Sequence, residues 1–122
     1  MSDKDIDIEK LKDKIDFNIK FWLEFEEKSV LGAGWAKLLK TINKEDVNSL
    51  TQAAKECGYS YKYAWNILKR IEERTTQTPV TTSKGGPGGG GSVELNQWGH
   101  QLLNIFEKLE EEVENIKKKL KI

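Results

Sequence analysis

Residues 49 to 71 read SLTQAAKECGYSYKYAWNILKRI, and this stretch decides the fold. Ser49 belongs to the residue types that cap a helix, and Gly58 allows the left-handed backbone conformation that commonly ends one. A second helix is predicted to begin at Ser60. Its apolar positions recur at the three-and-four spacing of one buried face, and they are Ala64, Ile67, Leu68 and Ile71. Two short helices joined by a tight glycine turn indicate a helix-turn-helix.

The other face of the second helix is polar and basic. It carries Ser60, Tyr61, Lys62, Asn66, Lys69 and Arg70. Hydrogen-bond donors, acceptors and positive charge on one helix face suit contacts with base edges in the major groove. The sequence therefore predicts double-stranded DNA as the partner. Trp65 is expected in the core or at its boundary, whereas Tyr61 and Tyr63 are equally consistent with packing and with groove contact.

The residues before this motif predict three further elements. A short amphipathic helix is expected from Asp5, because Ile8, Leu11 and Ile15 share one face. Apolar residues then alternate from Phe17 to Phe25, which predicts a half-buried strand that turns at residues 27–29 and returns at 30–31. A helix with its apolar side chains inside is expected to follow Gly32-Ala33-Gly34.

After the motif, two short strands are expected at about 79–82 and 92–95, joined by a glycine run from Gly85 to Gly91. Together they predict a β-hairpin wing. Gly-Gly-Gly-Gly-Ser is also typical of an inserted flexible linker, and this alternative stays open on composition alone. The run does not match a phosphate-binding loop, because no Gly-Lys-Ser/Thr follows it.

A long helix is predicted from about 96 to 119. Its apolar residues repeat at an interval of 11, and they are Leu102, Ile105, Leu109, Val113, Ile116 and Leu120. A helix of about 24 residues would be about 36 Å long, more than the core of a small domain requires. We therefore expect a homodimer through this stripe. Glu110 to Glu112 and Lys117 to Lys119 read as solvated faces, although their opposite signs would also suit antiparallel pairing.

Composition excludes several classes of function. Of the 122 residues 33% are charged, with 20 basic against 20 acidic, so the overall charge does not point to nucleic acid. Cys57 is the single cysteine, so no internal disulfide or cysteine metal cluster is expected. His100 has no companion ligand and is expected at a surface or interface. We expect a cytoplasmic protein without membrane span, metal, cofactor or small-molecule ligand, and not an enzyme, because no catalytic constellation or cofactor fingerprint is present.

Several segments together resemble one known family. They are LGAG at 31–34, GYSYKYAW at 58–65, KGGPGGGGSVEL at 84–95, and Gly99 with Leu102 and Leu103. From about Ile19 to Lys108 the chain is similar to the N-terminal DNA-binding domain of the ModE family of molybdate-responsive regulators. The resemblance implies a winged helix that dimerises largely through its terminal helix, with Ser60, Tyr61 and Lys62 in the recognition helix. Full-length members add a molybdate-binding module; this chain ends at Ile122 without it, so molybdate sensing is not expected to carry over.

The sequence thus predicts a mainly α (α+β) winged helix-turn-helix over residues 1–96 and a dimerisation helix over 97–122. The expected function is sequence-specific DNA binding by a homodimeric transcriptional regulator, with residues 60–73 in the major groove and 79–95 on the backbone. Candidate DNA-binding residues are Ser49, Thr51, Gln52, Ser60, Tyr61, Lys62, Tyr63, Asn66, Lys69, Arg70, Ser83, Lys84, Gly85 and Gly86. The alternatives are a protein-interaction dimer and a weakly specific architectural DNA-binding protein.

Overall fold

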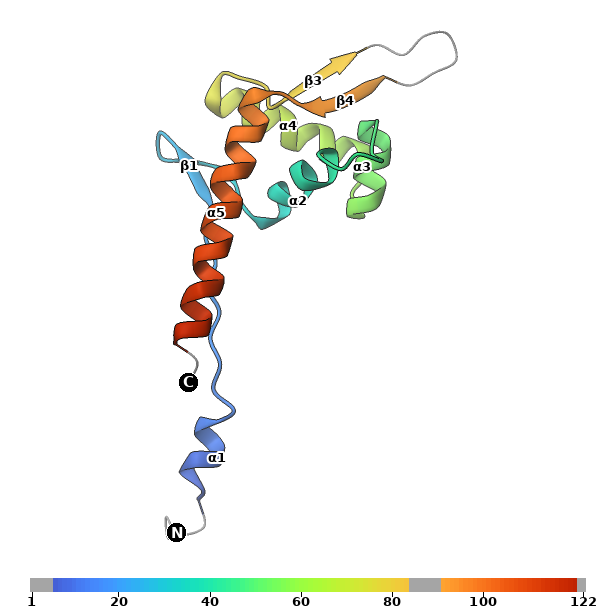
Figure 1. Ribbon diagram of the computed structural model, residues 1–122. Helices are drawn as coiled ribbons and strands as arrows, with labels where there is room; N and C mark the ends of the chain where they lie inside the picture. Colours follow the sequence, from blue (N-terminus) through green and yellow to red (C-terminus); the bar gives the residue numbers. More distant parts are fainter. Residues whose placement is uncertain (1–5, 84–90, 121–122) are drawn as a thin grey trace.

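The chain forms five helices and two strand pairs over the residues that the computed structural model describes, which are 6–83 and 91–120 (Figure 1). The elements, in chain order, are α1 (Ile8–Lys12), β1 (Leu23–Phe25), β2 (Lys28–Leu31), α2 (Ala33–Ile42), α3 (Leu50–Cys57), α4 (Tyr61–Thr75), β3 (Val80–Ser83), β4 (Ser92–Leu95) and α5 (Gln97–Lys119). This helix-rich α+β architecture agrees with the predicted class. Within the described residues, no helix combines the length and apolar character that a membrane crossing needs.

The hydrophobic core lies among α2, α3, α4, the first turns of α5 and the hairpin β3–β4. Leu38 and Leu39 of α2, Ile67 of α4 and Phe106 of α5 are almost completely buried there. The predicted buried stripe of α4 is confirmed, since all four of its apolar residues belong to this core. Ala53 of α3 is also fully buried, and its small side chain allows neighbouring helices to approach closely.

Local capping explains where α3 and α4 begin and end. The Ser49 hydroxyl accepts a hydrogen bond from the Gln52 amide at 3.1 Å, and the Ser60 hydroxyl accepts one from the Tyr63 amide at 3.0 Å. Gly58 has a φ of 76°, the left-handed conformation expected of it. The two helices and the glycine between them therefore lie where the sequence predicts, except that α4 continues to Thr75.

The N-terminal segment differs from its prediction in two ways. The strand expected from Phe17 forms only at Leu23–Phe25, and residues 17–22 are extended without belonging to a sheet. The turn lies at Glu26 and Glu27, both with positive φ, rather than at 27–29. This is a two-residue hairpin turn, in which Phe25 pairs with Lys28. The predicted alternation is nevertheless retained, because every second residue from 17 to 25 is partly buried.

Aromatic contacts hold this segment against α5. The rings of Phe21 and Phe106 lie 4.7 Å apart, and the rings of Phe25 and Trp98 meet edge to face at 6.3 Å. In Figure 1 the extended chain runs beside α5, and α1 lies beyond the C-terminal end of that helix. The predicted N-terminal helix is present but shorter than expected, because α1 ends at Lys12 before Ile15, and it has no buried residue.

The predicted hairpin strands pair antiparallel, from Val80 opposite Leu95 to Ser83 opposite Ser92. Residues 84–90, which contain most of the expected glycine tip, lie outside the described part of the chain. Asn96 then caps α5 by accepting a hydrogen bond from the Gly99 amide at 2.9 Å. The long C-terminal helix therefore begins where the sequence predicts.

Candidate nucleic-acid interface

Helix α4 presents a polar ridge on the side away from the core. Lys62, Asn66 and Lys69 are exposed and recur at spacings of four and three, so they lie along one line of the helix. Ser60 precedes the first turn and is also exposed, although its hydroxyl serves as the helix cap. The buried stripe and the exposed ridge thus divide α4 as the sequence predicts.

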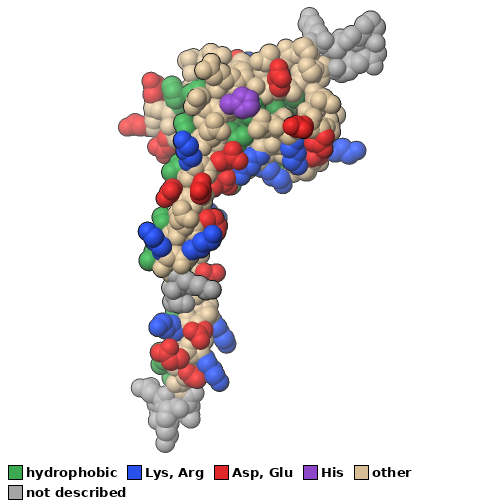
Figure 2. Space-filling model, viewed as in Figure 1, with side chains coloured by type: hydrophobic (Ala, Val, Ile, Leu, Met, Phe, Trp, Pro, Cys, Tyr) green, Lys and Arg blue, Asp and Glu red, His purple; other side chains and the backbone are tan. Residues whose placement is uncertain are grey.

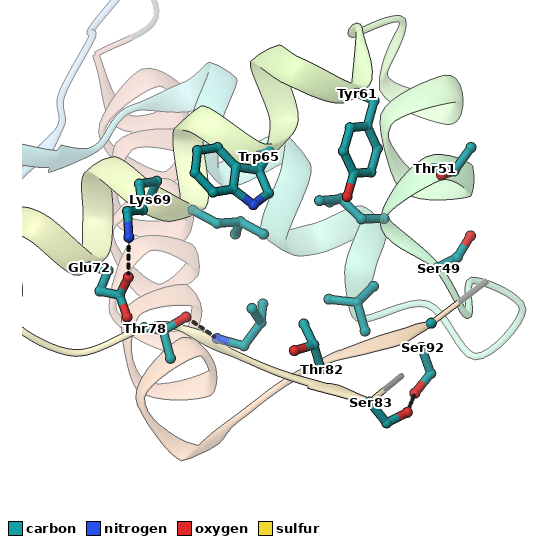
Figure 3. Close-up of a pocket in the computed structure, with 15 residues that line it drawn as sticks. Ser49, Thr51, Tyr61, Trp65, Lys69, Glu72, Thr78, Thr82, Ser83 and Ser92 are labelled. Carbon is teal, nitrogen blue, oxygen red and sulfur yellow. Dashed lines mark hydrogen bonds and ion pairs between the residues drawn. The ribbon is translucent and has the colours of Figure 1, made fainter. Parts of the chain in front are cut away.

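A groove of about 530 Å³ lies between this helix and the hairpin (Figure 3). Tyr61 and Trp65 project into it from α4, Ser49 and Thr51 border it from the start of α3, and the hairpin closes the opposite side. The hairpin lining is Val80, Thr82, Ser83, Gly91, Ser92 and Val93. The groove therefore joins three of the segments that carry predicted DNA-binding residues.

The sequence predicts Trp65 in the core or at its boundary, and the structure places it outside the core, at the groove. Its side chain is 47% exposed, because its position on α4 turns it toward the groove rather than toward the buried stripe. Tyr61 is exposed beside it. Tyr63 is also exposed, but its ring packs edge to face on Tyr59 at 4.9 Å, so it both packs and remains accessible.

Lys69 and Arg70 are adjacent in the second half of α4, but they face different surroundings. The Lys69 ammonium lies 3.5 Å from the Glu72 carboxylate and 5.8 Å from the centre of the Trp65 ring, at the edge of the groove. Arg70 instead lines a recess beside β2. A ligand in the groove would therefore meet Lys69. Arg70 lies on the other flank of the α4 ridge, away from the groove.

Gln52 has a structural role that the sequence did not reveal. Its side-chain oxygen accepts a hydrogen bond from the Asn48 amide at 3.1 Å, and its side-chain nitrogen donates to the Asp46 carbonyl at 2.7 Å. Both polar groups hold the turn before α3. Thr51, by contrast, is exposed at the groove.

The predicted wing residues are described only in part. The Ser83 and Ser92 hydroxyls contact each other across the hairpin, so the Ser83 hydroxyl already has one hydrogen-bond partner within its own chain. Lys84, Gly85 and Gly86 lie outside the described residues.

The residues of the predicted dimer stripe fall into two groups. Leu102 is 4% exposed and belongs to the core of its own chain. Ile105, Leu109, Ile116 and Leu120 are exposed, and Val113 is partly buried. Figure 2 shows apolar side chains along one edge of the α5 region, with acidic and basic side chains beside them. The stripe is therefore available for contact only beyond Leu102.

His100 is exposed on α5, as expected for a surface histidine. Cys57 is a buried free cysteine, whose sulfur lies 3.4 Å from the Thr41 hydroxyl. Across residues 6–83 and 91–120, no cluster of three or more His, Cys, Asp or Glu residues could hold a metal ion.

No protein-family model matches the chain. It is 36% identical over 61 residues to the DNA-binding transcriptional dual regulator ModE of Escherichia coli (strain K12), covering 50% of this chain and 23% of that protein. It is 34% identical over 80 residues to the molybdenum-pterin-binding protein MopB of Rhodobacter capsulatus, covering 66% of this chain and 28% of that protein. The chain thus spans about a quarter of the length of these relatives. Its predicted resemblance to ModE is confirmed by homologues named ModE and MopB over half to two thirds of this chain.

Proposed function

We propose that this chain is a winged helix-turn-helix that binds specific sites on double-stranded DNA as a homodimeric transcriptional regulator. The observation that carries the proposal is the exposed ridge of Lys62, Asn66 and Lys69 on α4, beside a groove that the hairpin borders. A helix with such a ridge fits the major groove, which is about 12 Å wide. The hairpin would then lie along the backbone next to it.

The contacts divide into two kinds. Lys62 and Asn66, with Ser60 and Tyr61 near the start of α4, would reach base edges, because the first turns of a recognition helix enter the groove most deeply. Lys69 and Arg70, near the other end, would contact phosphates. Lys84, Gly85 and Gly86, which follow β3 in the sequence, are proposed as backbone contacts on sequence alone, since glycine amides can approach a phosphate closely.

The relatives support a regulator rather than a catalyst. One is named a DNA-binding transcriptional dual regulator, and the others named ModE are transcriptional regulators. A dimer is proposed because Leu109, Ile116 and Leu120 remain exposed on one helix, and an apolar stripe of this kind gains stability by leaving water. Two copies would present two recognition helices to two half-sites.

Selection of bound sequences from a random duplex pool tests this function. We expect a recovered palindrome that binds at least about 10³-fold more tightly than random duplex, with an affinity that falls steeply as salt rises. Salt-dependent binding without sequence preference would indicate the architectural alternative. A chain that leaves all duplexes unbound at low salt would contradict DNA binding and favour the protein-interaction alternative.

A further inference from the structure

The exposed part of the α5 stripe has an ordered pattern of charge around it. Leu109, Val113, Ile116 and Leu120 follow one another at spacings of four, three and four, the spacing of a two-helix seam. Glu110 and Glu112 flank the first half of this seam, whereas Lys117 and Lys119 flank the second half. The two halves therefore carry opposite charge.

A second feature is the position of α1. Ile8, Leu11 and Ile15 are all more than half exposed, and α1 buries no residue. A helix of five residues is far too short to be stable by itself in water. Figure 1 places it beyond the C-terminal end of α5, away from the core of its own chain. Its apolar face is therefore without cover in a single copy.

We infer that two copies pair through α5 in antiparallel orientation, with Leu109 opposite Leu120 of the second copy and Val113 opposite Ile116, and that α1 of each copy packs on the α5 of the other. This inference rests on the proposed homodimer and specifies its geometry. The occupant of both apolar surfaces is thus another copy of the same chain.

Charge complementarity favours the antiparallel orientation. In this register Glu112 lies beside Lys119 of the other copy, and Glu110 lies beside Lys117, so every flanking charge meets an opposite one. A parallel in-register pair would bring Glu112 near Lys117 but would leave Glu110 and Lys119 unmatched. Glu110 also accepts a hydrogen bond from Lys40 of its own chain at 2.6 Å. The pair of Glu112 with Lys119 does not compete with this contact, so it is the pair that the antiparallel orientation adds.

The position of α1 gives independent support. In an antiparallel pair, the N-terminal half of the second α5 continues past Leu120 of the first copy, on the side where α1 lies. At about 1.5 Å per residue, the exposed Ile105 of the second copy would lie about 6 Å beyond Leu120. The exposed face of α1 would then meet another exposed apolar residue. In a parallel pair, both α5 helices end at the same level, so the second α5 would not reach α1.

Cysteine cross-linking distinguishes the two orientations. Leu109→Cys and Leu120→Cys are made separately in the full chain, each together with Cys57→Ala. Each variant is oxidised alone, and the two are also mixed, allowed to exchange subunits and then oxidised together. In the antiparallel pair, two copies of residue 109 are about 16 Å apart along the helix axis, too far for a disulfide, whose Cα atoms lie about 4.4 to 6.8 Å apart. We therefore expect a cross-linked dimer in the mixture and little in either variant alone.

A mixture of Glu111→Cys and Lys118→Cys is the matched control, because these residues lie at similar levels of α5 but point away from the seam. It should not cross-link. Efficient cross-linking of Leu109→Cys alone would overturn the antiparallel geometry while leaving the homodimer intact. A sedimenting dimer without cross-links in the mixture would do the same. A monomer at all concentrations would instead refute the proposed homodimer itself.

The role of α1 has its own test. Leu11→Ala should weaken dimerisation roughly tenfold, as truncation of a buried contact residue does, whereas Lys10→Ala on the polar side of α1 should leave it within about twofold. Sedimentation at several concentrations measures both dissociation constants. Equal dissociation constants for the two variants and the parent chain would overturn the packing of α1 on the second copy.

Discussion

Gly99, in the first turn of α5, lies so close to Pro79 that an added Cβ would stand 2.1 Å from the Pro79 carbonyl oxygen. The same oxygen accepts a hydrogen bond from the Asn96 amide at 3.1 Å, and the Asn96 side chain donates to the Thr78 carbonyl at 2.7 Å. The start of α5 is therefore packed against the base of the hairpin, backbone to backbone. This contact helps fix how the hairpin lies over α4.

Gly99→Ala should consequently destabilise the chain, by about 1 to 3 kcal/mol or more, because the backbone must shift to admit the methyl group. Chemical denaturation followed by circular dichroism measures the change in unfolding free energy. Gly34→Ala is a suitable control, since its Cβ would lie 3.5 Å from the Tyr59 hydroxyl, an ordinary contact, and alanine favours the α2 helix. Equal stability of Gly99→Ala and the parent chain would show that the hairpin base moves freely.

The second prediction concerns the ridge of α4. Lys62→Ala and Asn66→Ala should each weaken binding to a selected site by about 1 to 3 kcal/mol, with a much smaller effect on random duplex, because a base contact carries sequence information. Fluorescence anisotropy on both duplexes measures the difference. Equal losses on the two duplexes would assign these residues to the DNA backbone.

The helices of the core could be predicted because their signals are local. Ser49, Gly58 and Ser60 act within one turn of their own position, and the α4 stripe follows from spacing alone. The sequence predicts a turn at residues 27–29, but its actual position at Glu26 and Glu27 could not be predicted, because glutamate gives no signal for positive φ. The extended residues 17–22 have the alternation of a strand but lack a paired strand among the described residues.

The groove could not be predicted from the sequence either. The exposure of Trp65 depends on how far the hairpin folds back over α4, and this depends on long-range contacts such as that between Gly99 and Pro79. The hydrogen bonds of the Gln52 side chain to the turn at 46–48 could not be predicted either, because they depend on how that turn lies against α3. Residue type and helical face predicted which side of α4 is exposed, but not what stands opposite it.

The third prediction follows from the position of Glu72. Its carboxylate holds the Lys69 ammonium at 3.5 Å, on the edge of the groove where a phosphate would compete for the same cation. Glu72→Gln should therefore strengthen binding to all duplexes and steepen the salt dependence by up to about one unit. Titrations at several salt concentrations measure both effects.

A double-mutant cycle separates release of Lys69 from a general loss of negative charge. In a Lys69→Ala background, Glu72→Gln should have a much smaller effect than in the parent chain. The same gain in affinity in both backgrounds would mean that Glu72 acts on DNA directly rather than through Lys69.

The last prediction concerns assembly. Val113 lies in the middle of the α5 seam, where a second copy would cover it, so Val113→Glu would place a carboxylate in an apolar contact and among the acidic residues 110–112. The dimer should dissociate, which sedimentation measures directly. Asn115→Glu adds the same charge on an exposed, outward position of α5 and should leave the dimer intact.

Because a monomer holds only one half-site, Val113→Glu should greatly weaken binding to the full palindrome while binding to an isolated half-site stays unchanged. A stable Val113→Glu dimer with full affinity would mean that α5 does not join the two copies, since a buried unpaired charge could not be accommodated at that seam without cost.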